Sequence, residues 1–132
     1  ILNFGARIME CIKAADVLKK KGISVSIFDA RFAKPLDEKT IIELASNHEA
    51  IITIEEGSIG GFSSQVTKLL SDRGFFDKGL KFRSMILPDK FLDQDTPEKM
   101  YRIAGLDSES IIQKIENVLN SNVVIAKNKN LS

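Results

Sequence analysis

The sequence lacks an excess of charge of either sign and has only one cysteine. Its 19 lysine and arginine residues and 18 aspartate and glutamate residues leave a net charge of +1, so the charge balance does not indicate nucleic acid or an anionic membrane as a partner. One cysteine excludes an internal disulfide framework and a metal site built from several cysteines. No apolar run approaches the roughly 18–20 residues that cross a bilayer. We therefore expect no nucleic acid and no membrane among the partners.

The composition that is present is typical of one soluble globular domain. The chain has 132 residues, of which 43% are hydrophobic and 28% charged, and about 100–200 residues per domain is the usual scale. Its first residue is Ile1, which already belongs to an apolar run and is not a methionine. We therefore expect that the upstream part of a longer chain is missing.

Short β-rich runs alternate with segments of helical periodicity. Strands that alternate with helices imply right-handed crossovers and a mainly parallel sheet covered on both faces. The predicted fold is therefore α/β, a three-layer α/β/α sandwich over residues 1–119. Residues 120–132 form an asparagine-rich tail that we expect to be poorly ordered or loosely docked. Strands are predicted at residues 1–4, 24–28, 50–54 and 80–87, and helices around residues 8–18, 41–45 and 66–70, from residue 97, and around residues 111–119.

The most unusual stretch is Glu55-Glu56-Gly57-Ser58-Ile59-Gly60-Gly61-Phe62, which follows a predicted strand. In open α/β sheets, functional groups gather beyond the carboxyl ends of the strands. A glycine-rich turn before a helix could offer N–H groups to a phosphate, but the two carboxylates would repel the anion and the spacing fits neither nucleotide-binding glycine motif. A general acid–base pair would need further groups, because adjacent residues at a strand end point in different directions. We favour a structural role, in which the carboxylates accept turn N–H groups or pair across an interface.

The single histidine and the single cysteine do not form a catalytic pair in this pattern. His48 precedes a predicted strand, so it lies at the amino edge of the sheet, where we expect a solvated loop residue. Cys11 lies on the apolar face of the first helix and is expected to be a small core residue. A phosphoacceptor receiver domain needs an acid after its first strand. Here that strand ends in Phe4-Gly5, so the sequence does not fit a receiver domain. No cluster of metal ligands is predicted.

Two loops at the predicted carboxyl edge carry apolar side chains. Phe32 lies within residues 29–37, and Phe91 and Leu92 lie within residues 87–95. Exposed apolar residues on such loops are typical of a contact with another domain or subunit. The residues alone therefore predict an α/β domain that docks against a larger assembly.

The same loops carry a resemblance to a known family. Residues 29–37 (Asp-Ala-Arg-Phe-Ala-Lys-Pro-Leu-Asp), 54–62 (Ile-Glu-Glu-Gly-Ser-Ile-Gly-Gly-Phe) and 87–91 (Leu-Pro-Asp-Lys-Phe), followed by 96–101 and 104–107, resemble the C-terminal domain of the 1-deoxy-D-xylulose-5-phosphate synthase family. The five segments occur in the right order. The resemblance runs from the first residue to about residue 118.

This resemblance implies a transferase of the transketolase type, with three α/β domains per subunit and a homodimeric assembly. Such an enzyme uses thiamine diphosphate and a divalent metal, usually magnesium, to decarboxylate pyruvate and join the product to D-glyceraldehyde 3-phosphate. The resulting 1-deoxy-D-xylulose 5-phosphate feeds isoprenoid biosynthesis and, in bacteria, thiamine biosynthesis. The resemblance also implies a cytoplasmic, bacterial protein, of which this chain would be a third or less.

The resemblance places the cofactor and substrate machinery outside this chain. In the family, the glycine–aspartate motif for the diphosphate and metal lies in the N-terminal domain, and the catalytic glutamate and the phosphate-binding arginines lie in the middle domain. We therefore expect no catalytic, cofactor-binding or metal-binding residue in this segment, no cofactor bound to it, and no activity from it alone. Its partners would be the N-terminal and middle domains of the same chain and the second subunit.

The resemblance assigns this domain to domain packing and dimer contacts. Related C-terminal domains have a fifth, antiparallel strand that precedes the first parallel one, and we expect it upstream of Ile1. The residues expected at the contacts are Glu55, Glu56, Gly57, Gly60, Gly61 and Phe62, with Phe91, Leu92 and Asp93 on a second loop.

Two other functions stay open. The C-terminal domain of a 2-oxoacid dehydrogenase β subunit has the same fold and a similar acidic glycine turn, and would act as a partner-binding module for an acyltransferase core. Residues 29–37 and 96–107 favour the synthase over this alternative. An independent regulatory or ligand-binding α/β domain is the other possibility, and it would need a polar, concave site at the carboxyl edge of the isolated chain.

Overall fold

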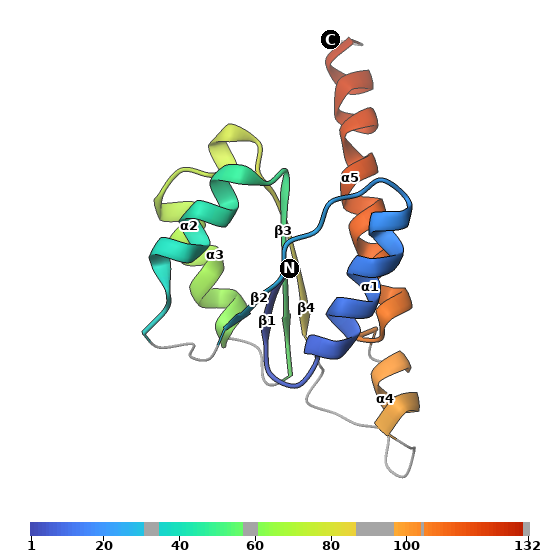
Figure 1. The fold of residues 1–132 in the computed structure, drawn as a ribbon. Coiled ribbons are helices and arrows are strands. Elements are labelled where there is room, and N and C mark those ends of the chain that lie inside the picture. The colour runs from blue at the N-terminus through green and yellow to red at the C-terminus, as the bar shows by residue number, and fades with distance from the viewer. Residues whose placement is uncertain (31–34, 57–60, 87–96, 104, 131–132) are drawn as a thin grey trace.

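The computed structural model describes residues 1–30, 35–56, 61–86, 97–103 and 105–130. Within these residues the centre of the fold is a four-stranded sheet in the order β2-β1-β3-β4, and all neighbouring strands are parallel (Figure 1). The order places the first strand in the middle, so the chain crosses over the sheet in both directions from it. The strands are β1 (Leu2–Phe4), β2 (Phe28–Ala30), β3 (Ala50–Glu55) and β4 (Lys81–Ile86).

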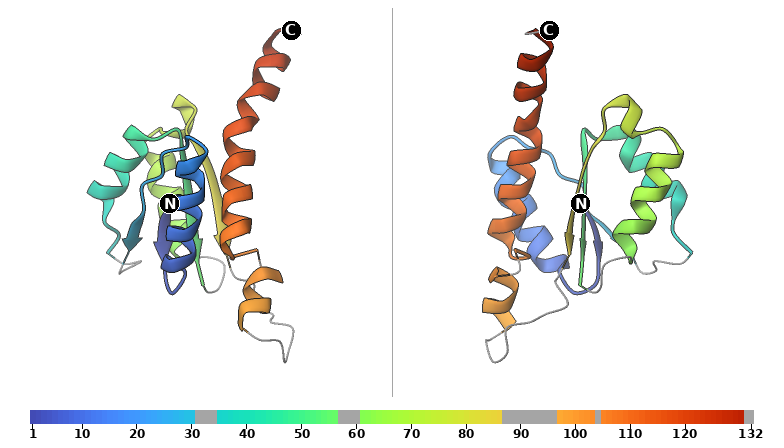
Figure 2. Two further views of the ribbon diagram at one scale, coloured as in Figure 1. Left: turned by 45° about the vertical axis from the view of Figure 1, so that its right-hand side comes forward. Right: turned by 180° about the vertical axis from the view of Figure 1, so that it is seen from behind.

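Helices cover both faces of the sheet. Figures 1 and 2 show α1 and α5 on one face and α2 and α3 on the other, with the short α4 beyond the carboxyl edge of the strands. The predicted three-layer α/β/α sandwich with a parallel sheet is therefore confirmed. The helices are α1 (Ile8–Lys20), α2 (Glu38–Asn47), α3 (Phe62–Asp72), α4 (Pro97–Ile103) and α5 (Ser108–Asn130), with a 3₁₀ turn, η1 (Phe76–Lys78), before β4.

The core consists of two apolar clusters, one on each face of the sheet. Ile52 and Ile54 of β3 contribute to the cluster under α1 and α5, whereas Ile51 contributes to the cluster under α2 and α3. Every residue of β3 after Ala50 is buried, which is typical of a parallel strand covered on both faces. The near-continuous apolar run of β3 therefore packs against the helices on both faces of the sheet.

The second strand was predicted too early in the chain. The sequence pattern indicates a strand over residues 24–28, but β2 begins only at Phe28, in register with Leu2 of β1. Val25 and Ile27 instead pack against the cluster under α1 and α5. Ser26 still accepts a hydrogen bond from the amine of Ile1, but the ladder with β1 begins only at Phe28, and β-rich composition does not show where two strands begin to pair.

The prediction of a solvated His48 is wrong. His48 follows the last residue of α2, and its ring is half-buried. Nδ1 lies 2.7 Å from the carbonyl oxygen of Leu44, and Nε2 lies 2.8 Å from Oγ of Ser26. The ring therefore ties the end of α2 to the segment that leads into β2, a contact between segments that no local pattern indicates.

The last helix is longer than the sequence pattern predicts. Helical periodicity was expected to end near residue 119, but α5 continues to Asn130 and extends past the sheet (Figure 2). Residues 120–130 contain neither glycine nor proline, the residues that most often stop a helix. The expected flexibility of residues 120–132 remains a prediction. No helix within the described residues is long and apolar enough to cross a membrane.

The prediction that Cys11 is a core residue is confirmed. Its side chain is fully buried, and its sulfur lies 3.9 Å from Oδ1 of Asn3. Burial raises the pKa of the Cys11 thiol to about 11, so very little thiolate forms at neutral pH.

Alkylation of Cys11 tests this burial. At pH 8 we expect iodoacetamide to modify the native chain about 100-fold more slowly than the chain in denaturant, because only the thiolate reacts and the native thiol stays protonated. Mass spectrometry of the alkylated chain over time measures both rates. Equal rates in the two conditions would show that the thiol is exposed in the native state.

Candidate functional site

Glu55 closes the N-terminus of α3. The N–H groups of Phe62 and Ser63, the first two residues of the helix, donate to the two carboxylate oxygens of Glu55 at 2.8 and 3.2 Å. Gly61, the residue before the helix, has no side chain that could cap it. Glu55 is only 2% exposed, and its negative charge lies against the positive end of the helix dipole. Accepting N–H groups, one of the two structural roles predicted for this acidic pair, is therefore confirmed for Glu55.

This capping occupies the two N–H groups at the start of α3. A phosphate at the start of α3 would need the same N–H groups that already donate to Glu55. The Glu55 carboxylate in turn accepts both of these hydrogen bonds and is buried. Its arrangement is the structural one that the sequence favours.

Glu56 points to a different neighbour. Its Oε1 accepts a hydrogen bond from Nε of Arg7, 3.1 Å away, at the start of α1. The guanidinium carbon of Arg7 lies 3.5 Å from the centre of the Tyr101 ring in α4, which is a cation–π contact. Glu56 therefore links β3 to α1 and, through Arg7, to α4. The prediction that adjacent carboxylates diverge is confirmed.

A glycine and an asparagine complete the junction at the end of β1. Gly5 has φ of +118°, a conformation that L side chains rarely adopt, so the turn after β1 favours glycine. The side-chain amide of Asn3, which is fully buried, donates to the carbonyl of Gly5 and to Oδ1 of Asp29, at 3.1 and 3.0 Å. Asn3 thus ties the ends of β1 and β2 together.

Three residues of this junction were absent from the sequence-based prediction. Asn3, Arg7 and Tyr101 were not predicted to contribute to it. A polar residue inside an otherwise apolar strand was a usable signal for Asn3, because buried polar groups need partners. Arg7 and Tyr101 carried no such signal, since their contact joins two segments far apart in the chain.

Only some of the residues predicted at the contacts lie within the described part of the chain. Gly61 and Phe62 are described, and the buried Phe62 ring stacks on Phe4 with 5.4 Å between ring centres. Their expected role in domain and dimer contacts remains a prediction, as it does for Glu55 and Glu56. Outside the described residues lie Gly57, Gly60, Phe91, Leu92 and Asp93, together with Phe32 and most of the two loops predicted to dock.

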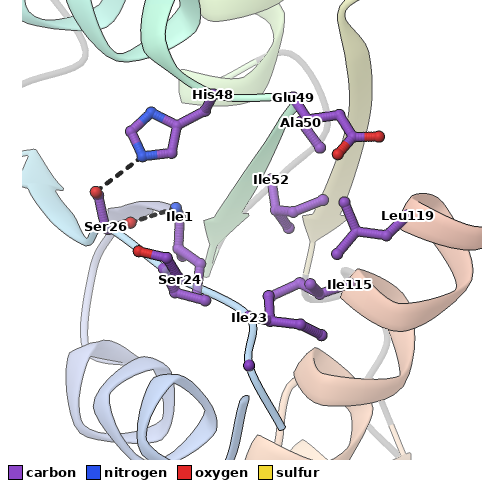
Figure 3. A pocket seen from close by; sticks show the side chains of 12 residues that line it. Ile1, Ile23, Ser24, Ser26, His48, Glu49, Ala50, Ile52, Ile115 and Leu119 are labelled. Atoms are coloured by element: carbon purple, nitrogen blue, oxygen red, sulfur yellow. Dashed lines mark hydrogen bonds between the residues drawn. The ribbon is translucent and has the colours of Figure 1, made fainter. Parts of the chain in front are cut away.

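A pocket lies at the opposite, amino edge of the sheet. Figure 3 shows it between the segment before β2, the start of β3 and α5, with a volume of about 300 Å³. Ile52, Ile115 and Leu119 form its apolar wall, and His48 lies on its rim. The His48 ring is bonded to Ser26 there, so the pocket offers mainly apolar surface. The polar junction at the carboxyl edge is thus the better candidate for a functional surface.

Comparison with known families agrees with this architecture. Residues 1–111 match the family described as "Transketolase, C-terminal domain". The chain belongs to the transketolase C-terminal domain family. The match covers all four strands and reaches the beginning of α5. Membership of this family indicates an enzyme of the thiamine diphosphate-dependent class.

The described residues of this transketolase C-terminal domain do not fit a site for thiamine diphosphate or for a divalent metal. Across the described ranges, no three histidine, cysteine, aspartate or glutamate side chains come together in a way that could hold a metal ion. The N–H groups at the start of α3, which would suit a diphosphate, donate to Glu55 instead. No step of cofactor chemistry is therefore derived from these residues.

Proposed function

We propose that this chain is the C-terminal domain of a 1-deoxy-D-xylulose-5-phosphate synthase. That enzyme condenses pyruvate with D-glyceraldehyde 3-phosphate, using thiamine diphosphate and magnesium, and releases CO2. The observation that carries the proposal is the family match over residues 1–111, within which residues 29–37, 54–62, 87–91, 96–101 and 104–107 resemble the synthase in the right order. The full enzyme would act as a cytoplasmic homodimer in bacterial isoprenoid and thiamine biosynthesis.

In this proposal the domain packs against the rest of the enzyme and does not carry the chemistry. The two acidic side chains at the carboxyl edge support this division of roles. Glu55 caps α3 and Glu56 pairs with Arg7, so both carboxylates stabilise the edge of the domain. The described part of this edge comes from β1, β3, α1 and α3, and in this proposal it contacts the other domains or the second subunit.

A second candidate is the C-terminal domain of a 2-oxoacid dehydrogenase β subunit. It belongs to the same structural class, and its acidic glycine turn is similar to residues 55–57. In that case the domain would bind an acyltransferase core. The sequence upstream of Ile1 distinguishes the two, because the synthase carries the cofactor motif and all three domains on one chain, whereas the dehydrogenase divides them between subunits.

A domain exchange tests the proposal. The C-terminal domain of an active 1-deoxy-D-xylulose-5-phosphate synthase is replaced by this chain, and product formation is measured with thiamine diphosphate and magnesium. We expect the hybrid to retain at least one tenth of the parent activity and the isolated chain to form no product. A matched hybrid that carries the C-terminal domain of a dehydrogenase β subunit should be inactive. An inactive hybrid of this chain that still folds and dimerises would contradict the proposal.

A further inference from the structure

β4 forms an open edge of the sheet. It is the last strand in the order β2-β1-β3-β4, and within the described ranges no strand pairs with its outer side. The N–H of Lys81 donates to the carbonyl of Glu49, 3.2 Å away, on the side of β3. Backbone groups of successive residues in a strand point to opposite sides, so the odd-numbered residues of β4 bond to β3 and the even-numbered ones face outward. The outward-facing residues are Phe82, Ser84 and Ile86.

A groove of about 350 Å³ runs between this open edge and α5. Ser84 and Ile86 line it from β4, and Gln113, Lys114 and Asn117 line it from α5. Figure 2 shows α5 beside the sheet on the side of β4. The groove therefore places polar helix side chains next to the N–H and C=O groups that face outward from the strand. An extended peptide that binds here would form main-chain hydrogen bonds with β4, and its side chains would contact those of α5.

Two described cations lie at or beside the groove, Lys114 in its lining and Arg83 on the neighbouring strand. Nη1 of Arg83 donates to the carbonyl of Phe82 at 2.7 Å, and this carbonyl faces the open edge, so the guanidinium lies at the edge itself. Lys114 adds a second cation from α5. Within the described part of the chain, neither Arg83 nor Lys114 forms an ion pair, and no acidic side chain lines the groove.

These cations decide which occupant fits. Two copies of β4 paired edge to edge would bring the Arg83 side chains of both copies into one small sheet region, and like charges across strands are destabilising. An acidic segment would instead place carboxylates next to Arg83 and Lys114. We propose that the open edge of β4 binds an extended acidic peptide segment of a partner protein, which adds a strand to the sheet beside α5.

Binding of a defined peptide tests the charge requirement. The probe is a fluorescein-labelled hexapeptide of alternating valine and glutamate, and its counterpart has lysine in place of every glutamate. We expect fluorescence anisotropy to show at least 10-fold tighter binding of the acidic peptide, with the difference shrinking as salt rises from 50 to 500 mM. Lys114→Glu should weaken binding of the acidic peptide at least 10-fold. Lys39→Glu, an exposed cation on α2 in the opposite layer, is the matched control and should change nothing.

Amide hydrogen exchange tests the strand geometry. On binding of the acidic peptide, the amides of Phe82, Ser84 and Ile86 should gain protection, whereas those of Arg83 and Met85 already face β3 and should not change. Ser84→Pro removes one outward N–H without removing a bond to β3, so it should abolish binding while circular dichroism shows a folded chain. If Ser84→Pro does not fold, the loss of peptide binding expected for Lys114→Glu still tests the contact with α5.

Three outcomes would overturn the proposal. The first is equal affinity for the acidic and the basic peptide. The second is protection that does not alternate along β4, because that would indicate general stabilisation and not strand addition. The third is a concentration-dependent dimer, detected by sedimentation, in which the outward amides are protected without peptide; a second copy of the chain would then be the occupant.

Discussion

Replacing Glu55 with alanine is expected to lower the free energy of unfolding by about 3 kcal/mol. The substitution leaves the N–H groups of Phe62 and Ser63 without their acceptor in a buried setting, and each buried donor that loses its partner costs roughly 1–3 kcal/mol. It also removes a negative charge from the N-terminus of α3. Urea unfolding followed by circular dichroism measures the loss, and the melting temperature should fall by about 10 °C.

Two variants make the Glu55 prediction specific. Glu55→Gln keeps one acceptor oxygen and the side-chain volume but loses the charge. Its free energy of unfolding should therefore fall by about half as much as that of Glu55→Ala. Glu43→Ala removes an exposed carboxylate on α2 and should change stability by less than about 0.5 kcal/mol. Equal stability of Glu55→Ala and Glu43→Ala would contradict the capping role.

Replacing Phe62 with alanine is expected to be still more destabilising, by about 3–5 kcal/mol. The ring is fully buried and stacks on Phe4, with the two ring planes 17° apart. Removal of a buried aromatic side chain loses its transfer free energy and leaves a cavity between α3 and the end of β1. Because Phe62 also donates its N–H to Glu55, movement of the helix start would disturb the cap as well.

Phe75→Ala provides the matched control for the Phe62 prediction. Phe75 packs only at the margin of the same core cluster and is partly buried, so its loss should cost about 1–2 kcal/mol. Chemical denaturation of both variants under the same conditions compares them. A Phe62→Ala variant no less stable than Phe75→Ala would show that the start of α3 is not a core position.

The sequence pattern predicted the layers well but not their local details. The β-rich run of residues 50–54 identified β3 and the helical spacing identified α1, although Met9, Ile12 and Val17 of α1 stay exposed. The start of β2 was misplaced by four residues, from Ser24 to Phe28, because a strand is defined by its partner. Pairing with β1 begins at Leu2 and Phe28, and composition does not show where two distant segments start to pair.

In the candidate site, too, the sequence predicted some contacts and not others. An acid at the end of β3 followed by glycines indicated that Glu55 accepts N–H groups, and the structure bears this out. The pattern did not identify which N–H groups these are, because the chain has to return from residue 55 to residue 62 before they meet. The pairing of Arg7 with Glu56 and Tyr101, and of His48 with Ser26, had no local signal at all.

The sequence by itself determined the near-neutral charge, the parallel three-layer fold and the carboxyl edge of β3 as the place where polar groups gather. These properties follow from periodicity and composition, since each residue's burial depends mainly on the face of its own helix or strand. Only the tertiary structure decided that the acidic pair is divided between α3 and Arg7, and that β4 presents an open edge beside α5. Such contacts join residues far apart in the chain, and their geometry exists only after the layers have packed.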